Sequence, residues 1–398
     1  MPVFNKADIL LPEKVEYKKW SVVACDQYTS EKEYWDRVEE NVGDAPSTLN
    51  IVYPEAYLSE GDARIEKINS CMHKYLADGL FKEYKNSYIY VERTLSGNRV
   101  RRGIIGTIDL EDYDYTKGSK SKIRATEGTV AERIPPRVKI RENAPLELPH
   151  AILLIDDKED IVIPKGSDKE PIYDFDLMED GGHIKGYVID GKEADVIAEK
   201  FEKYALSVKD GLVFAVGDGN HSLATAKTCW ENLKKTLSEE EQKNHPARFC
   251  LVEVENLYDE ALEFEPIHRV LFNVNPEEVI NSLKKFSSEG KGDKDHKVKF
   301  VYGETQDEIV LKNTSSNLAV GAVQNFIDKM GYDADYIHGD DTTKRLAAKE
   351  NAFGFILSSM EKESLFETVI KDGALPRKTF SMGEAHEKRF YIEAKKIK

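Results

Sequence analysis

The stretch LVFAVGDGNHSLATAKTCW (residues 212–230) decides how this chain is interpreted. LVFAV is an apolar run typical of a buried strand, and LATAKTCW continues as a helix, so a polar turn joins the two. The first turn of a helix has unpaired N–H groups and the positive end of the helix dipole, and both attract anions. Glycine also lets a ligand approach the backbone closely. The turn is therefore a predicted phosphate or carboxylate site.

This turn, GDGNHS, holds more reactive groups than a simple connection requires. In an ordinary strand-to-helix turn, Asp218 or Asn220 would cap the helix and nothing further would be needed. The density of polar groups favours a functional site, and we expect Asp218 and His221 to be its catalytic residues. The predicted anion-binding residues of the turn are Gly217, Gly219, Asn220 and Ser222.

Composition limits the class of protein. The chain has 398 residues, a net charge of −16, 40% hydrophobic residues and 33% charged residues, which is typical of a globular protein with more than one domain. The acidic balance argues against non-specific binding to nucleic acid or to an anionic membrane. The N-terminal residues do not resemble a signal peptide, and the cysteines lack metal-site spacing, so we expect a cytoplasmic protein with reduced thiols.

Apolar periodicity predicts an α+β fold with two domains. Residues 1–250 are expected to form a mixed-sheet domain that carries the anion site, with a hairpin formed by YIYVERTL and RRGIIGTIDL. Residues 251–398 show the order strand, helix, strand, strand, helix, strand, which is typical of a ferredoxin-like βαββαβ domain. The C-terminal tail is expected to pack back on the first domain, because its aromatic residues need burial.

A group of cations interrupts this acidic sequence between residues 124 and 141. Arginine binds phosphate and carboxylate through a planar fork of donors, so the group suits an anionic ligand. The alternative is that these side chains pair with carboxylates elsewhere in the protein. Prolines predict that much of the segment is extended rather than helical. The candidate anion-binding residues are Arg124, Arg133, Arg137 and Arg141, accompanied by Lys139.

Polar residues also flank the predicted strand AILLI. His150 precedes it, and Asp156 and Asp157 follow it, at positions where sites gather in α/β sheets. The two aspartates, together with Asp218, are candidate Mg²⁺ ligands, although such a pair also occurs in solvated turns. His150 is a secondary site candidate, as are His268 and Arg269.

Several common enzyme classes are not indicated. The sequence has no G-x-S-x-G elbow, no Walker loop and no H-E-x-x-H helix. Asp218, His221 and Ser222 are too close in sequence to align as nucleophile, base and orienting group of a hydrolase triad.

Three segments together resemble a bacterial and archaeal family known as DUF1015. They are RATEGTVAERIPPRVKIRENAPLELPHAILLIDD (residues 124–157), GDGNHS (217–222) and PIHRVLF (266–272). The family's turn usually has the sequence Ala-Asp-Gly-His-His-Arg. Asp218, Gly219 and His221 match it, whereas Asn220 and Ser222 depart from it. An arginine there would be a natural phosphate ligand, and its loss would weaken anion binding unless one of the arginines from Arg124 to Arg141 substitutes for it.

The same turn is similar to one in the ParB and sulfiredoxin-like group, which includes kinases of free serine. This resemblance implies a nucleotide-dependent phosphotransferase, with Mg²⁺ and ATP or ADP as cofactors and a small polar metabolite such as serine as substrate. Asp218 would be the base or metal ligand, Asn220 and His221 would contact phosphate, and Arg137 and Arg141 would neutralise charge. The alternatives are a non-catalytic sensor of a phosphorylated or carboxylated metabolite, and a scaffold. The sequence leaves the oligomeric state open.

Overall fold

The computed structural model describes residues 2–128 and 134–398, so the predicted site residue Arg133 lies outside the described residues. The chain divides into two compact units, Met1–Leu262 with Glu384–Lys398, and Glu263–Gly383. The expected boundary after residue 250 falls inside strand β11 (Phe249–Asn256), which is paired on both sides. The first unit therefore continues to Leu262, and the last fifteen residues of the chain return to it.

A mixed sheet forms the centre of the first unit, in the strand order β4-β5-β10-β7-β11-β3-β2-β9-β8, with β1 paired to β2. The pairs β4/β5, β5/β10 and β7/β11 are parallel and the others are antiparallel. The predicted β2/β3 hairpin is confirmed. Besides β11, the strands of this sheet are β1 (Ala7–Pro12), β2 (Phe81–Thr94), β3 (Val100–Asp109), β4 (Tyr113–Asp114), β5 (Ile123–Ala125), β7 (Ile152–Ile155), β8 (Tyr173–Asp176), β9 (His183–Ile189) and β10 (Phe214–Asp218).

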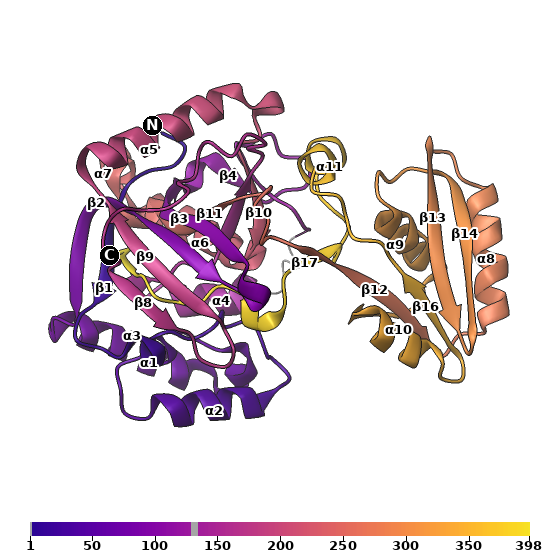
Figure 1. Ribbon diagram of the computed structural model, residues 1–398, viewed down its shortest axis with the longest axis horizontal. Coiled ribbons are helices and arrows are strands. Elements are labelled where there is room, and N and C mark those ends of the chain that lie inside the picture. The colour runs from indigo at the N-terminus through magenta and orange to yellow at the C-terminus, as the bar shows by residue number, and fades with distance from the viewer. Residues whose placement is uncertain (1, 129–133) are drawn as a thin grey trace. The chain divides into compact units, whose positions relative to one another are not determined.

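Helices cover both faces of this sheet (Figure 1). Successive strand residues point to opposite faces, so Ile89 joins one hydrophobic core and Tyr90 joins the other. The core of Ile89 includes Trp20 and Trp35 from the N-terminal helices, and the core of Tyr90 includes Phe201 of α5. The helices of the unit are α1 (Tyr17–Trp20), α2 (Lys32–Val42), α3 (Gly61–Ala77), α4 (Ile134–Arg141), α5 (Gly191–Ser207), α6 (Asn220–Leu233) and α7 (Glu239–Asn244).

The predicted extended arginine segment is partly wrong, because residues 134–141 form helix α4. Pro135 and Pro136 lie in its first turn, where their missing N–H groups would have no intrahelical partner. α4 packs against α6, so this basic segment lies beside the helix of the predicted anion site.

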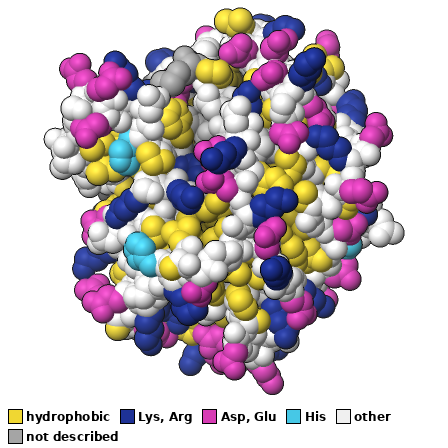
Figure 2. Space-filling model, turned by 90° about the vertical axis from the view of Figure 1, so that its left-hand side faces the viewer, with side chains coloured by type: hydrophobic (Ala, Val, Ile, Leu, Met, Phe, Trp, Pro, Cys, Tyr) yellow, Lys and Arg dark blue, Asp and Glu magenta, His cyan; other side chains and the backbone are white. Residues whose placement is uncertain are grey.

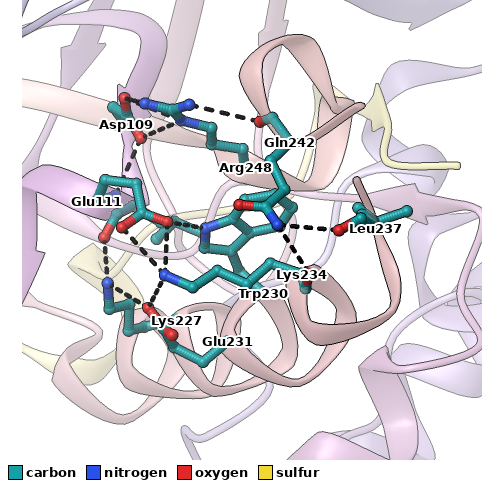
Figure 3. Close-up of polar contacts among 10 residues, drawn as sticks. Asp109, Glu111, Lys227, Trp230, Glu231, Lys234, Leu237, Gln242 and Arg248 are labelled. Carbon is teal, nitrogen blue, oxygen red and sulfur yellow. Dashed lines mark hydrogen bonds and ion pairs between the residues drawn. The ribbon is translucent and has the colours of Figure 1, made fainter. Parts of the chain in front are cut away.

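Helix α6 is anchored to the loop after β3 by the polar network in Figure 3. Trp230 Nε1 donates to Glu111 Oε1 at 2.6 Å, and Lys234 Nζ donates to the same oxygen at 2.9 Å. Burial opposes ionisation of Glu111, but these two donors outweigh it and lower the pKa of the carboxyl. Arg248 pairs with Asp109 at 2.6 Å beside this contact. The C-terminal half of α6 is thereby fixed, and with it the position of its first turn.

The second unit is an antiparallel sheet in the order β14-β13-β16-β12-β15, with β17 paired to the start of β12. Helices α8 and α9 pack on one face, in a core that contains Leu283, Phe326 and Phe353. Its strands are β12 (Phe264–Phe272), β13 (Lys294–Tyr302), β14 (Thr305–Thr314), β15 (Ala334–His338), β16 (Ala352–Ile356) and β17 (Phe380–Met382), and its helices are α8 (Pro276–Ser288), α9 (Ala319–Met330), α10 (Asp340–Ala347) and α11 (Ser364–Asp372). A separate two-stranded sheet, β6 (Leu146–Glu147) with β18 (Lys395–Lys396), belongs to the first unit.

The α+β class is confirmed, but the strand order of the second unit differs from the expected ferredoxin-like arrangement. The six expected elements occur in order, as β12, α8, β13, β14, α9 and β15. A later strand, β16, is inserted between β12 and β13, and the β13/β14 hairpin places β14 at the sheet edge. Gly354 allows this insertion, because a Cβ there would lie 2.9 Å from the Cβ of Ala347 in α10.

Among the described residues, no helix is both long enough and apolar enough to span a bilayer. On the face of the first unit shown in Figure 2, basic and acidic side chains are interspersed and do not form a continuous surface of one sign.

We predict that Glu111→Ala lowers the free energy of unfolding by about 1–3 kcal/mol, because it leaves the buried Trp230 N–H without its acceptor. Urea denaturation followed by tryptophan fluorescence measures this loss. The matched control is Glu240→Ala, since Glu240 is 79% exposed in its ion pair with Lys243 and should change stability by less than about 0.5 kcal/mol. Equal losses in the two variants would contradict the anchoring role of Glu111.

Candidate anion-binding site

The predicted strand-to-helix corner is present between β10 and α6. The pairing of β10 with β7 shifts register between Val216 and Asp218, so Gly217 occupies an irregularity of the kind often found beside active sites. Gly219 precedes α6 with φ +80°, and a Cβ there would lie 2.8 Å from Ala151 Cα. Both the left-handed backbone and the close approach require glycine at this position.

The antiparallel pairing of β7 and β10 determines which predicted residues meet. Asp218 at the end of β10 is opposite Ile152 at the start of β7, so His150 lies beside the corner, with its Cδ2 only 2.9 Å from a Cβ built on Gly219. Asp156 and Asp157 follow β7 and therefore lie at the opposite end of that strand. The structure thus brings together His150 and Asp218 but separates Asp218 from the other two predicted metal ligands.

The C-terminal segment completes this cluster. Ala24 N donates to Arg389 O at 2.8 Å and Tyr391 N donates to Val22 O at 2.9 Å, so residues 389–391 run beside residues 22–24. This pairing brings Lys388 to the corner, where its Nζ lies 3.3 Å from Asp218 Oδ2. Both side chains are largely enclosed, with 9% of Lys388 and 23% of Asp218 exposed.

A chain of polar contacts links His150 to the loop after residue 24. His150 Nδ1 lies 2.6 Å from the hydroxyl of Tyr391, which donates to Cys25 Sγ at 3.2 Å. His150 Nε2 lies 3.5 Å from Asp26 Oδ2. With both ring nitrogens protonated, His150 donates to Tyr391 and faces the Asp26 carboxylate. The imidazole is thus held in one orientation by two partners.

Both members of the His150–Asp26 pair are held in their charged forms. Burial disfavours the imidazolium, but Tyr391 and Asp26 outweigh it and hold the pKa of His150 well above its ordinary value. Burial likewise disfavours the Asp26 carboxylate, but His150, Gln27 and Lys388 outweigh it and hold the pKa of Asp26 well below its ordinary value. At neutral pH the cluster contains an imidazolium and a carboxylate rather than two neutral groups.

Sequence reasoning missed Asp26, Lys388 and Tyr391. Asp26 directly follows the apolar segment SVVAC, so the rule that selected Asp156 after AILLI would also have selected Asp26. Lys388 and Tyr391 carried no such signal, because their approach to the corner depends on a pairing between the two ends of the chain.

The first residues of α6 make different contacts. Asn220 accepts from Thr126 N at 3.2 Å and donates to Thr126 Oγ1 at 3.3 Å, so its amide ties the helix start to the end of β5. This contact positions the first residue of α6, and the predicted phosphate contact of Asn220 stays a prediction. His221 and Ser222 lie half-buried in the first helical turn.

The predicted arginines that the structure describes, Arg124, Arg137 and Arg141, are engaged by other parts of the first unit. Arg124 donates to the carbonyls of Ser121 and Asp210, which precede β5 and β10 and so lie away from the corner. Arg141 pairs with Glu147. Arg137 pairs with Glu55, whose backbone N donates to Cys25 O at 2.8 Å. Arg137 is therefore the predicted cation that is linked to the loop of Asp26.

His268 and Arg269 belong to the second unit, on β12. His268 accepts from Leu357 N at 3.1 Å through Nδ1, and its Nε2 lies 3.0 Å from Asp340. Arg269 is fully buried and donates to the carbonyls of Ile267, Arg377 and Lys378. The arginine thus has a structural role within its own unit.

The predicted metal ligands do not form a ready-made cage. Asp157 accepts from Ile161 N and Val162 N at 2.7 and 2.8 Å, which organises the loop after β7. Within residues 2–128 and 134–398, no three His, Cys, Asp or Glu side chains are grouped closely enough to hold a metal ion. Of the three predicted ligands, Asp218 lies at the corner, where its Oδ2 is 3.3 Å from Lys388 Nζ, so the fit to Mg²⁺ rests on this carboxylate.

A hollow of about 910 Å³ lies elsewhere on the first unit. It is lined by mixed charges, including Lys18, Lys19, Asp176 and His183. His183 contacts Asp174 and Asp176, both at 2.7 Å. The hollow does not include the corner residues, and its mixed charge favours no one class of ligand.

The comparisons with known proteins agree with the motifs quoted above. A family model described as "Protein of unknown function (DUF1015)" matches residues 9–330, which confirms the expected resemblance. No curated protein matches the sequence. Similar solved structures include a free serine kinase in complex with AMP, at 13% identity and TM-score 0.37, with 72% of this chain and 93% of that chain covered.

Two further solved structures show a similar degree of likeness. C-terminally truncated SbnI from Staphylococcus aureus has 10% identity and a TM-score of 0.35, covering 72% of this chain and 82% of that chain. A conserved hypothetical protein from Pyrococcus furiosus has 12% identity and a TM-score of 0.32, covering 71% and 93%. Because these TM-scores are low, nothing about the chemistry of this chain is inferred from them.

We predict that Gly219→Ala destabilises the protein by at least about 2 kcal/mol more than Gly211→Ala. Both glycines have positive φ, +80° and +66°, but a Cβ at Gly211 meets nothing within 4 Å. The control therefore carries the same backbone strain without the clash against Ala151 and His150. The free energies of unfolding of both variants test this, and equal destabilisation would exclude a tight approach at the corner.

Replacing His150 should change stability in a pH-dependent way. His150→Gln removes the partner of Asp26, and we expect a loss of about 2 kcal/mol, limited by the 32% exposure of the Asp26 side chain. The raised pKa of His150 makes its contribution disappear as pH rises through that value, and the lowered pKa of Asp26 makes its contribution disappear as pH falls through that value.

The loss should therefore be largest between about pH 4.5 and 6, where both contributions are complete. Urea unfolding of wild type and His150→Gln across a pH series measures it. The control is His73→Gln, which replaces an exposed histidine on α3. A difference between wild type and His150→Gln that does not vary with pH would rule out the ion pair.

Proposed function

The chain belongs to the DUF1015 family, whose description assigns no function, and we propose that it is a nucleotide-dependent phosphotransferase acting on a small polar metabolite such as serine. One observation carries the proposal. Asp26, His150, Asp218 and Lys388 meet around the start of α6, where a helix N-terminus and Gly219 can receive an anion.

The charges of these four side chains favour a metal-dependent anion. His150 and Lys388 balance Asp26 and Asp218, so the cluster is neutral before a ligand binds. A nucleotide phosphate group would add several negative charges in a partly buried place, and a divalent cation would compensate for them. Mg²⁺ commonly binds one or two protein carboxylates together with water and substrate phosphates, which suits Asp218. When bound, the metal would neutralise phosphate charge.

Phosphoryl transfer requires little covalent work from a protein beyond positioning, charge neutralisation and a base. We assign Asp218, which directly precedes the anion-receptive turn, to metal binding. Asp26 is held ionised by His150 and is assigned as the base that takes the proton of the acceptor hydroxyl. The hydroxyl oxygen then bonds to phosphorus as the bond to the nucleotide leaving oxygen breaks. His221 and Ser222 are the proposed phosphate contacts of the first helical turn.

A sensor of a phosphorylated or carboxylated metabolite is the second candidate function. The observation in its favour is that the corner is internally satisfied, with Asn220 bound to Thr126 and Asp218 bound to Lys388. A sensor would bind the same ligand without transferring its phosphate. The two candidates therefore differ in turnover and not in the location of the site.

Phosphorus NMR of the protein with Mg²⁺, ATP or ADP, and a pool of free amino acids including serine tests the proposal. We expect a new phosphomonoester resonance that depends on one acceptor. Asp26→Asn should lower turnover by roughly 10²- to 10⁴-fold at every Mg²⁺ concentration, as loss of a base does. Asp218→Asn should raise the Mg²⁺ concentration needed for half-maximal turnover.

The control for these variants is Asp168→Asn, an exposed aspartate of the first unit that is outside the cluster. It should leave turnover unchanged. Nucleotide resonances that broaden on adding protein, with no new phosphomonoester, would favour the sensor and contradict the phosphotransferase. Full turnover by Asp26→Asn would remove Asp26 as the base.

A further inference from the structure

The corner GDGNHS contains no lysine or arginine, although it is the proposed binding place for phosphate. A helix N-terminus attracts an anion only weakly at an exposed position, so a tight phosphate site also needs a cation. We propose that Lys388, contributed by the C-terminal segment, is that phosphate-binding cation. The inference rests on the proposed function and names the residue on which its nucleotide binding depends.

Three of the arginines predicted from the sequence are described by the structure, and each has a partner other than Asp218. Arg124 lies away from the corner and binds the carbonyls of Ser121 and Asp210. Arg141 is paired with Glu147, which is itself 1% exposed and also contacts Lys395 at 3.2 Å. Arg137 is paired with Glu55, which is itself bonded to the loop of Asp26. Among the described residues, Lys388 is instead the cation in direct contact with Asp218.

The backbone of Lys388 is held by hydrogen bonds on both sides. Its own carbonyl accepts from Arg93, a buried arginine that also binds the carbonyls of Gly181 and His386. On its other side, Arg389 O accepts from Ala24 N, and Arg389 Nε donates to Pro149 O at 2.9 Å. The backbone at Lys388 is therefore fixed between the segments that carry Asp26 and His150.

The ammonium group retains capacity for a ligand. An ammonium has three N–H donors, and Asp218 at 3.3 Å accepts one of them. Lys388 also acts on Asp26, where it helps to hold the carboxylate ionised. The ammonium thus contacts the carboxylate assigned to the metal, and its remaining donors can meet a phosphate oxygen at the helix start. Because only 9% of this side chain is exposed, water screens the attraction weakly.

Calorimetric titration of wild type, Lys388→Met and Lys396→Met with Mg²⁺-ADP, adenosine and pyrophosphate tests this role. Lys388→Met should weaken ADP binding roughly 10- to 100-fold and leave adenosine binding unchanged, because only the phosphates meet the ammonium. Lys396→Met is the matched control, since Lys396 is 50% exposed and pairs with Glu83. It should bind all three ligands as wild type does.

Two results would overturn the assignment. One is wild-type affinity of Lys388→Met for ADP, and the other is an equal loss of affinity for ADP and adenosine, which indicates a purely structural role. Circular dichroism establishes that the variant is folded. If Lys388→Met does not fold, Lys388→Gln keeps a polar side chain of similar length without the charge, and the same criteria apply to it.

Pyrophosphate separates this inference from the proposed function. A wild-type protein that binds pyrophosphate through Lys388 but binds no nucleotide would support the role of Lys388 and overturn the nucleotide-dependent function. Nucleotide binding that does not change in Lys388→Met would support the function and overturn this role. A wild-type protein that binds neither ligand would overturn both.

Discussion

The candidate site depends on the buried contacts of the Arg389 guanidinium. This group donates to Pro149 O at 2.9 Å and to Glu393 at 2.7 Å, and it pairs with Glu253 of β11. Arg389 is 4% exposed, and its charge persists because Glu253 and Glu393 outweigh the effect of burial and raise its pKa. Removing one partner of a buried pair leaves an uncompensated charge, so the carboxylates and the guanidinium require one another.

This buried pairing explains how residues far apart in sequence form one cluster. Pro149 immediately precedes His150, and Lys388 immediately precedes Arg389, so a single side chain sets the spacing of both functional candidates. The backbone bond from Ala24 to Arg389 then adds Asp26 to the same group. The two carboxylates and the two cations of this cluster balance one another in charge when no ligand is bound.

Local features of the sequence predicted individual strands and helices better than they predicted which strands pair in a sheet. The LVFAV strand, the following helix and the β2/β3 hairpin follow from apolar periodicity and were anticipated. The insertion of β16 into the second sheet was not, because strand order depends on long-range pairing that periodicity does not record. Helix α4 was misjudged for a different reason, since prolines interrupt a helix interior but are tolerated in a first turn.

The same distinction holds for the candidate site. Asp218 and His150 were selected because they flank apolar strands, and the antiparallel pairing of those strands brings them together. The basic segment stands out because the rest of the chain is acidic. This difference in charge does not show which carboxylate each arginine binds. Arg141, for example, forms an ion pair with Glu147, only six residues away. Lys388 could not be predicted, because a long-range pairing between residues 389–391 and residues 22–24 brings it to the corner.

The position of the second unit within the chain has a consequence for biosynthesis. Residues 263–383 are inserted between β11 and the C-terminal segment of the first unit. A ribosome therefore releases the whole second unit before it releases Arg389, and Glu253 waits without its buried counter-charge until then. A prematurely terminated chain that lacks the last fifteen residues would therefore leave Glu253 without the guanidinium that pairs with it. Removing one partner of a buried pair is strongly destabilising, so the first unit needs the end of the chain to complete its interior.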